Sequence, residues 1–215
     1  MNSSTLPGFV SIEGPIGVGK TTLARRLAET FGSDLILEGA EENPFLEKFY
    51  QDPKSVALPT QLYFLFQRVK QLQELRQSDM FSPCHISDYL MDKDRLFARV
   101  TLDDDELHLY EQVYANLTLD APTPDLVVYL QAPIEVLMAR IRTRGRQNEA
   151  PISMEYLQKI NDAYTHYFHY YDKSPLLIVN SSGLDIVKNE NDYQQLVETI
   201  LSTTGGKHYF NPSID

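Results

Sequence analysis

The chain has 215 residues, and its 30 acidic against 19 basic side chains give a net charge of −11. This balance argues against a long surface for nucleic acid or for an anionic membrane, because both need a basic footprint. No apolar run reaches the ~18 residues of a membrane span, and the first residues lack the pattern of a secretory signal. The single cysteine, Cys84, excludes an intramolecular disulfide and indicates a buried thiol in a reducing compartment. We therefore expect a cytoplasmic protein whose ligands are small molecules.

Short apolar runs alternate with longer helical patterns, which is typical of a parallel sheet wrapped by helices. The predicted strands are 9–12, 35–37, 84–87, 125–130 and 176–179. The predicted helices are 20–31, 54–77, 105–118, 134–144, 153–172 and 192–202. The sequence thus predicts a single α/β domain over residues 1–204 with a five-stranded parallel sheet. Residues 205–215 have little periodicity and are expected to form a tail that is mobile or docked on a partner.

The helix predicted over 54–77 carries an apolar stripe at three- and four-residue spacing. This pattern favours packing on the sheet or on a second subunit over any role in binding a cofactor. The stripe consists of Leu58, Leu62, Leu65, Val69, Leu72 and Leu75.

A GxxxxGK[ST] sequence follows the first predicted strand and opens the first predicted helix. Glycines let the backbone curl so that its N–H groups face phosphate oxygens, and the helix adds its positive end. Lys20 is expected to reach the β- and γ-phosphates, and the Thr21 hydroxyl is expected to hold Mg²⁺. A glycine-rich turn with an accidental lysine is the alternative. The predicted site for a nucleoside triphosphate comprises Gly14, Pro15, Ile16, Gly17, Val18, Gly19, Lys20, Thr21 and Thr22.

Four arginines fall within seven positions at the end of the helix predicted over 134–144, in an otherwise acidic chain. A solvated helix end would explain them, because cations are favoured at a helix C-terminus. A mobile lid over about 140–152 explains them better, since arginines stabilise the charge of a transferring phosphoryl group. Such a lid also expels water from the site. The arginines are Arg140, Arg142, Arg144 and Arg146.

Two carboxylates follow predicted strands at the sheet edge where ligands of parallel α/β proteins bind. Glu38, after the second strand, could accept the proton of an attacking hydroxyl. Asp88, after the third, could help to hold Mg²⁺, although it could instead cap the next helix. The sequence contains no Asn-Lys-x-Asp segment, which lowers the expectation of a GTPase.

Together these motifs resemble those of the deoxynucleoside kinases over about residues 8–180. The segment from Glu38 to Pro44 matches the E-x₄-N-P pattern of the bacterial branch, whose glutamate is the general base for the nucleoside 5′-hydroxyl. The resemblance implies that Tyr50 binds the sugar 3′-hydroxyl and that Gln61 hydrogen-bonds the nucleobase. In the family's R-x₃-R-x-R-x₂-E pattern the arginines meet phosphates and the glutamate assists at the 3′-hydroxyl. These positions correspond to Arg140, Arg144, Arg146 and Glu149.

Two further matches concern recognition of the nucleobase. Arg68 and Asp94 stand where purine-accepting members of the family carry an Arg and an Asp, although a surface salt bridge would also explain the pair. One departure is clear: the family has an arginine directly after the acid of the third strand, and this chain has Tyr89 there. Lys93 or Arg95 could supply the missing charge.

The resemblance implies ATP- and Mg²⁺-dependent phosphorylation of a deoxynucleoside at its 5′-hydroxyl, most consistent with a purine substrate, by a protein that forms homodimers. Two alternatives stay open at this point. A nucleoside monophosphate kinase would need an arginine near its acceptor phosphate, where this chain has Tyr89. A nucleotide-binding switch would bind ATP without phosphorylating a small molecule.

Overall fold

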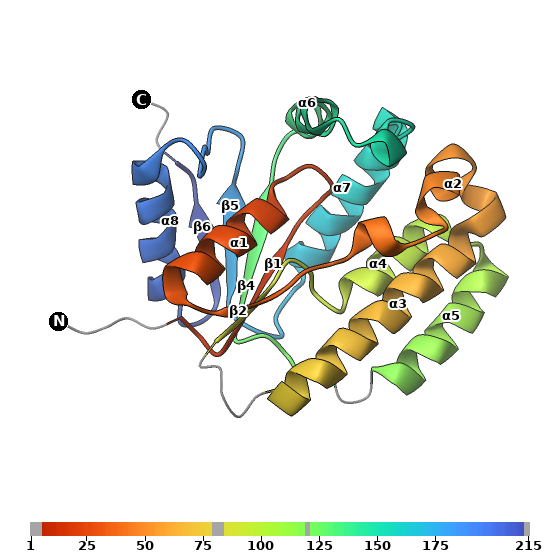
Figure 1. Cartoon of the computed structure of the whole chain (residues 1–215), viewed down its shortest axis with the longest axis horizontal. Coiled ribbons are helices and arrows are strands. Elements are labelled where there is room, and N and C mark those ends of the chain that lie inside the picture. Colours follow the sequence, from red (N-terminus) through yellow and green to blue (C-terminus); the bar gives the residue numbers. More distant parts are fainter. Residues whose placement is uncertain (1–5, 79–83, 119–120, 213–215) are drawn as a thin grey trace.

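A computed structural model describes residues 6–78, 84–118 and 121–212, without the side chains of 75–78. Six parallel strands form one sheet in the order β2-β3-β1-β4-β5-β6 (Figure 1). All five neighbouring pairs run parallel, so every strand ends at the same edge of the sheet. The strands are β1 (Phe9–Glu13), β2 (Asp34–Ile36), β3 (His85–Ser87), β4 (Leu126–Gln131), β5 (Leu176–Asn180) and β6 (Lys207–Phe210).

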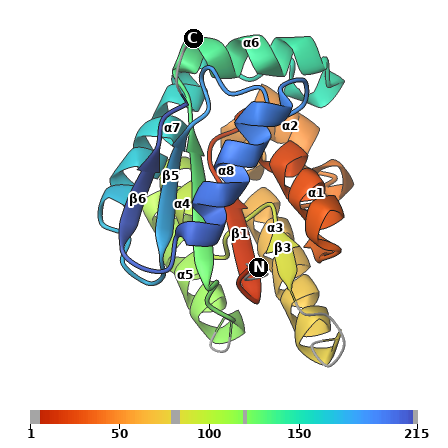
Figure 2. The ribbon, with the colours of Figure 1, turned by 90° about the vertical axis from the view of Figure 1, so that its left-hand side faces the viewer.

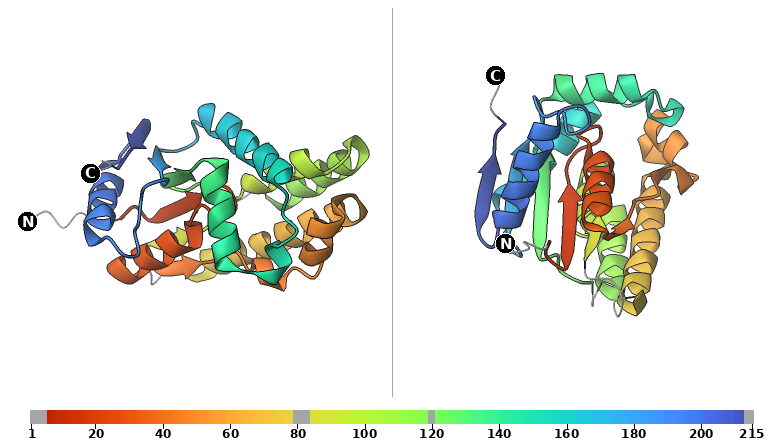
Figure 3. Two further views of the ribbon diagram at one scale, coloured as in Figure 1. Left: turned by 90° about the horizontal axis from the view of Figure 1, so that it is seen from above. Right: turned by 60° about the vertical axis from the view of Figure 1, so that its left-hand side comes forward.

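Helices cover both faces of the sheet, and one helix crosses its top (Figures 2 and 3). Side chains of alternate strand positions pack on α1 (Lys20–Phe31), α6 (Ile134–Arg144) and α8 (Glu190–Ser202) in the largest core. The intervening positions, such as Val127 and Tyr129, pack on α4 (Lys93–Thr101) and α7 (Met154–His169) on the opposite face. This alternation follows from the two-residue period of a strand, and strands buried on both faces are largely apolar.

An outer layer next to α4 consists of α3 (Pro53–Ser78) and α5 (Asp104–Leu117). The apolar stripe of α3 explains the packing: Leu65, Val69 and Leu72 are buried against α4 and α5, and Ile36 of β2 packs against the same cluster. The side chain of Leu75 lies outside the described residues. Near its start α3 is kinked, because Val56 has non-helical backbone angles and Pro59 lacks the N–H that a regular helix would use.

The prediction of five strands was wrong by one. Residues 207–210, expected in the tail, form β6 and pair in parallel with β5. The ammonium of Lys207 donates to the carbonyl oxygens of Phe168 (3.2 Å) and His169 (2.5 Å) at the end of α7. A cation is favourable at a helix C-terminus. The expectation of a mobile or docked tail was therefore wrong for this segment, whereas residues 213–215 lie outside the described part.

Two short helices near the carboxyl edge were not predicted. One is α2 (Leu46–Gln51) and the other is α4, which begins at Lys93. Two 3₁₀ turns, η1 (Ala40–Glu42) and η2 (Gln147–Glu149), lie in the loops after β2 and α6. These four elements surround the carboxyl ends of β1, β2 and β3, where the predicted site residues converge.

Candidate active site

The loop between β1 and α1 has the geometry of a phosphate cradle. Gly14, Gly17 and Gly19 have φ angles of 147°, 84° and 107°, which side-chain-bearing residues rarely adopt. A Cβ on Gly14 would lie 2.3 Å from the carbonyl oxygen of Leu130. The Lys20 ammonium donates to the carbonyl oxygens of Gly14 (2.8 Å) and Pro15 (3.3 Å). Glycine backbone, helix N-terminus and lysine together fit the phosphates of a nucleoside triphosphate.

Glu13, which the sequence analysis missed, fixes the start of this loop. It is 1% exposed, and its carboxylate accepts hydrogen bonds of 2.8 Å from the N–H groups of Gly14 and Leu90 and from the Tyr164 hydroxyl. One buried carboxylate thus ties the phosphate loop to the segment after β3 and to α7. Its position at the end of a buried strand, directly before Gly14, is the signal that could have identified it.

A hydroxyl and a carboxylate suited to Mg²⁺ meet beside the loop. The Thr21 hydroxyl donates to Asp88 across 2.5 Å, and the other Asp88 oxygen accepts the backbone N–H of Glu38 at 2.7 Å. Oxygen donors of this kind are those that Mg²⁺ prefers, usually as one or two protein ligands with phosphates and water. No cluster of three or more potential metal ligands occurs among the described residues. The alternative role of Asp88 as a helix cap was wrong, because α4 begins at Lys93 with Asp92 at its N-cap.

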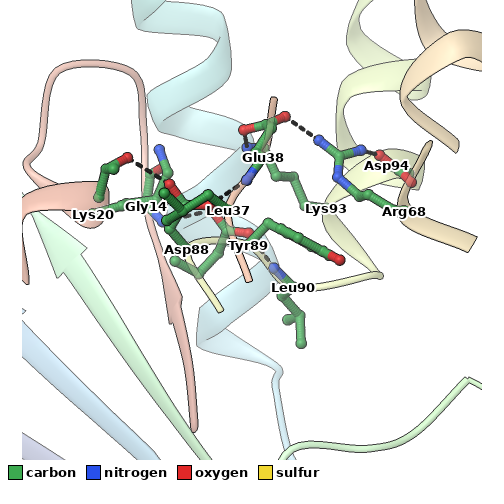
Figure 4. Close-up of polar contacts among 12 residues, drawn as sticks. Gly14, Lys20, Leu37, Glu38, Arg68, Asp88, Tyr89, Leu90, Lys93 and Asp94 are labelled. Atoms are coloured by element: carbon green, nitrogen blue, oxygen red, sulfur yellow. Dashed lines mark hydrogen bonds and ion pairs between the residues drawn. The ribbon is translucent and has the colours of Figure 1, made fainter. Parts of the chain in front are cut away.

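The carboxylate of Glu38 is held between two cations (Figure 4). One oxygen accepts a 2.8 Å hydrogen bond from the Lys93 ammonium, and the other accepts one from the Arg68 guanidinium. Burial alone would raise the pKa of Glu38, but Lys93, Arg68 and Lys20 lower it well below its usual range. The pKa of Lys20 is lowered to about 8, first by burial and then by Lys93. Glu38 is therefore an anion that is strongly paired and poised beside the phosphate loop.

Arg68 joins Glu38 to a second carboxylate. Its guanidinium forms ion pairs with Glu38 and with Asp94, whose side chain is 2% exposed. The remaining oxygen of Asp94 and the Nε of Arg68 are buried and have no hydrogen-bond partner among the described residues. Buried polar atoms of this kind normally find a partner, so they identify a place where a polar ligand edge can bind. The alternative of a surface salt bridge was wrong, because both groups are buried.

Lys93, and not Arg95, is the cation that stands near Glu38 in place of the family arginine. Tyr89 is 1% exposed, and its ring lies 5.3 Å from the guanidinium carbon of Arg68. Lys93 is 6% exposed and contacts Glu38 directly, whereas Arg95 pairs with Glu111 at 2.9 Å on α5. Of the two candidates, the structure places Lys93 at the site and Arg95 away from it.

Arginines at the end of α6 and just after it fold over the same site. Gly145, with φ of 67°, ends the helix, and Arg144 then donates to Glu149 at 2.5 Å. Arg146 pairs with Glu41 of η1 at 2.6 Å and with Glu149 at 3.5 Å. The segment after α6 thereby bridges to the segment after β2 through ion pairs that are partly exposed.

Most of the predicted site residues line one cavity of about 330 Å³, which we call the Glu38 cavity. Its volume is in the range of small-molecule sites. Tyr50 lies in it with a pKa raised by burial and by the nearby Glu149 and Glu38. The predicted residues that line it are Ile16, Gly17, Lys20, Thr21, Glu38, Tyr50, Gln61, Arg68, Asp88, Asp94, Arg144, Arg146 and Glu149.

A second cavity, the Arg140 cavity, lies on the other side of the phosphate loop. It is lined by Val18, Gly19, Thr22 and the segment 181–188, together with Arg140. Arg140 donates to the carbonyl oxygens of Val18 (3.1 Å) and Ser181 (2.7 Å). Arg140 therefore braces the phosphate loop against the segment after β5 and does not share the Glu38 cavity with Arg144 and Arg146.

Comparison with known proteins agrees with this geometry. The model of the family "Deoxynucleoside kinase" matches residues 10–204. The chain is 37% identical to the deoxyguanosine kinase of Bacillus subtilis over 196 residues, which cover 87% of this chain and 93% of that one. It is 28% identical to the deoxyadenosine kinase of Lactobacillus acidophilus over 205 residues, covering 89% and 94%. The solved structure of deoxyadenosine kinase from M. mycoides with bound dATP superimposes with a TM-score of 0.78 at 26% identity, covering 91% and 100%.

The chain belongs to the deoxynucleoside kinase family. It is an enzyme that phosphorylates deoxynucleosides with ATP, as the resemblance implied, and the two alternatives of a monophosphate kinase and a non-enzymatic switch are set aside. Among the described residues, no helix is long and apolar enough to cross a membrane.

Proposed function

We propose that the protein transfers the γ-phosphoryl group of ATP to the 5′-hydroxyl of a purine deoxynucleoside, for nucleotide salvage. The observation that carries this proposal is the Glu38 cavity itself. A buried carboxylate there lies between the phosphate-loop lysine, Lys20, and a buried Arg68–Asp94 pair. One end of the cavity fits a phosphoryl donor, and the other fits a polar base edge.

The preference for a purine rests on the polar atoms at the far end of the cavity. Arg68 offers donors and Asp94 an unpartnered acceptor oxygen, and Gln61 is 3% exposed beside them. A purine edge has this complementarity, with the acceptor N7 beside an amino donor in adenine and O6 beside N1–H in guanine. Relatives named deoxyguanosine and deoxyadenosine kinases support the same choice.

We assign the proton transfer to Glu38. As the 5′-oxygen bonds to the γ-phosphorus, the bond from that phosphorus to the bridging oxygen of ADP breaks, and the hydroxyl proton passes to the Glu38 carboxylate. The contact with Lys93 at 2.8 Å orients Glu38, so Lys93 takes over the positioning role of the family arginine. Lys20, Arg144 and Arg146 stabilise the charge on the transferring group.

We assign the metal to Thr21 and Asp88, whose oxygens lie 2.5 Å apart. Bound there, Mg²⁺ would neutralise charge on the β- and γ-phosphates. Residues 140–152 act as a lid that excludes water, with Glu149 and Tyr50 at the sugar 3′-hydroxyl. Close packing of Tyr50 along the sugar edge would disfavour a 2′-hydroxyl.

We also propose a homodimer in the cytoplasm. Phe66 on α3 and Leu109 on α5 are 54% and 49% exposed, which leaves apolar surface on the outer helical layer. Size-exclusion chromatography with light scattering should give twice the 24.6 kDa of one chain. A mass of one chain would contradict the dimer without affecting the assignment of the active site.

The substrate is tested by offering deoxyadenosine, deoxyguanosine, deoxycytidine, thymidine and thymidine monophosphate singly with Mg·ATP. ADP release and the 5′-monophosphate product are both measured, with a control that lacks acceptor. We expect rapid turnover of a purine deoxynucleoside and little turnover of thymidine or its monophosphate. Preferred use of thymidine would contradict the roles of Arg68 and Asp94.

A further inference from the structure

Arg68 lies at the junction between base recognition and proton transfer. One guanidinium nitrogen pairs with Asp94 at the base end of the Glu38 cavity, and another pairs with Glu38 (Figure 4). The side chain is 3% exposed and lies over the rings of Phe64 and Tyr89, at 5.1 and 5.3 Å from their centres. Arg68 is therefore desolvated, and its few partners determine where it points.

Both oxygens of Glu38 are engaged by cations, one by Lys93 and the other by Arg68. A general base must point a lone pair at the hydroxyl that it deprotonates. Each carboxylate oxygen has two lone pairs, and the one that faces Arg68 becomes available to the hydroxyl only if the guanidinium turns away. A guanidinium presents several donors in a rigid fork, so an acceptor at the base end competes directly with Glu38 for it.

We propose that binding of the nucleobase draws Arg68 from Glu38 toward the base edge and Asp94, and so releases the general base only when a nucleoside fills the site. This inference rests on the proposed role of Glu38. Arg68 then acts as a positioning residue that couples the identity of the base to the rate of phosphoryl transfer. Lys93 stays on Glu38 throughout and keeps the carboxylate oriented.

The coupling predicts that a sugar without a base is a poor acceptor for a reason beyond weak binding. 1,2-Dideoxyribofuranose has the same 3′- and 5′-hydroxyls but leaves Arg68 on Glu38, so its saturating turnover should be low. Truncated substrates lose turnover in this way when remote binding energy is used at the reacting centre. In Arg68→Gln the restraint is gone, and the turnover of this sugar should rise by about tenfold. This is the effect of a change of one unit in the pKa of the general base, Glu38.

The first experiment compares saturating turnover of the deoxynucleoside and of 1,2-dideoxyribofuranose in the parent, Arg68→Gln and Arg95→Gln. Arg95 is the matched control, because it is an arginine next to Asp94 that pairs with Glu111 outside the site. We expect the ratio of the two turnovers to collapse in Arg68→Gln, chiefly by a gain for the sugar, and to stay parental in Arg95→Gln. A fall in sugar turnover in Arg68→Gln would overturn the coupling.

The deciding measurement of the second experiment is made on the parent enzyme. Adenine is added to the parent enzyme with 1,2-dideoxyribofuranose, at the concentration that halves turnover of the deoxynucleoside and therefore occupies the base site. Adenine should accelerate phosphorylation of the sugar, and it should give no acceleration in Arg68→Gln. Failure of adenine to accelerate the parent reaction overturns the coupling. Parental activity of Glu38→Gln would instead overturn the proposed function, so the two failures are distinguishable.

Discussion

The two cavities on either side of the phosphate loop are built by different means. The Glu38 cavity is formed by buried, charged side chains, among which Arg68, Asp88, Lys93 and Asp94 are at most 6% exposed. The Arg140 cavity is lined by the phosphate loop, by Arg140 and by the segment 181–188, where Val187 is 68% exposed. Each buried charge must be paired to offset its desolvation, so the groups of the Glu38 cavity depend on one another.

This difference relates to the ligands that the phosphate loop and the Glu38 cavity must recognise. Phosphates are bound by many equivalent N–H groups, for which the backbone conformation matters more than any side chain. A nucleoside must be distinguished from near analogues, which requires polar groups that are left unpaired by the wrong ligand. We therefore expect the phosphate loop to be sensitive to glycine substitutions and the Glu38 cavity to be sensitive to single charge changes.

The largest effect on ATP affinity is expected from a glycine of the phosphate loop. In Gly17→Ala the new Cβ would lie 2.8 Å from Ile141 Cγ1 and 2.9 Å from the carbonyl oxygen of Leu137, at a φ of 84°. Such strain costs about 1–3 kcal/mol, so ATP affinity should fall roughly 5- to 150-fold. Titration calorimetry with ATP measures this loss of affinity. Gly183→Ala is the control, because Gly17 and Gly183 both line the Arg140 cavity and nothing lies within 4 Å of a Cβ on Gly183. Equal losses in both variants would contradict a conformational role for Gly17.

The next effect is expected on kcat, from the removal of a charge in the Glu38 cavity. Lys93→Ala removes a charge-assisted hydrogen bond worth about 1.5–3 kcal/mol, and kcat should fall roughly 10- to 150-fold. Lys93→Arg should restore part of this loss, because it returns a cation that can reach Glu38. Arg95→Ala, which removes a partly exposed ion pair, should stay near the parent. Steady-state kinetics of the three variants test the assignment, and parental turnover of Lys93→Ala would refute it.

The smallest expected effect is the pH dependence of ATP affinity at the phosphate loop. The pKa of Lys20 is lowered to about 8, and the protonated ammonium is the form that attracts phosphate. ATP affinity should therefore be full below pH 8 and fall by up to tenfold per pH unit above it. Because Lys93 contributes to this lowering, the decline should move to higher pH in Lys93→Ala. Calorimetric affinities between pH 7 and 9.5 test this, and a flat profile would contradict it.

Elements with clear end signals were predictable from the sequence, and short or atypical ones were not. The bounds of α1 were predicted, because Gly19 and Gly32 mark its ends in the left-handed conformation. The nine residues of α4 are too few for an extended helical pattern, and the four of β6 follow a Gly-Gly pair. Both depend on tertiary packing more than on local propensity.

The same distinction applies to the site. Residues of contiguous motifs, such as Lys20 and Thr21, were predictable from spacing. The choice between Lys93 and Arg95 was not, because positions i and i+2 of a helix face different directions and the helix itself was missed. The contact between Arg68 and Glu38 joins residues thirty positions apart and has no local signal.

The rate of the chemical step in Glu38→Gln tests the central assignment most directly. Rapid-quench measurement of 5′-monophosphate formation in a single turnover separates phosphoryl transfer from product release. Removal of a general base costs about 10²- to 10⁴-fold, so we predict a loss of this size with nearly unchanged affinity for the purine deoxynucleoside. A single-turnover rate equal to that of the parent would show that Glu38 does not accept the proton of the 5′-hydroxyl.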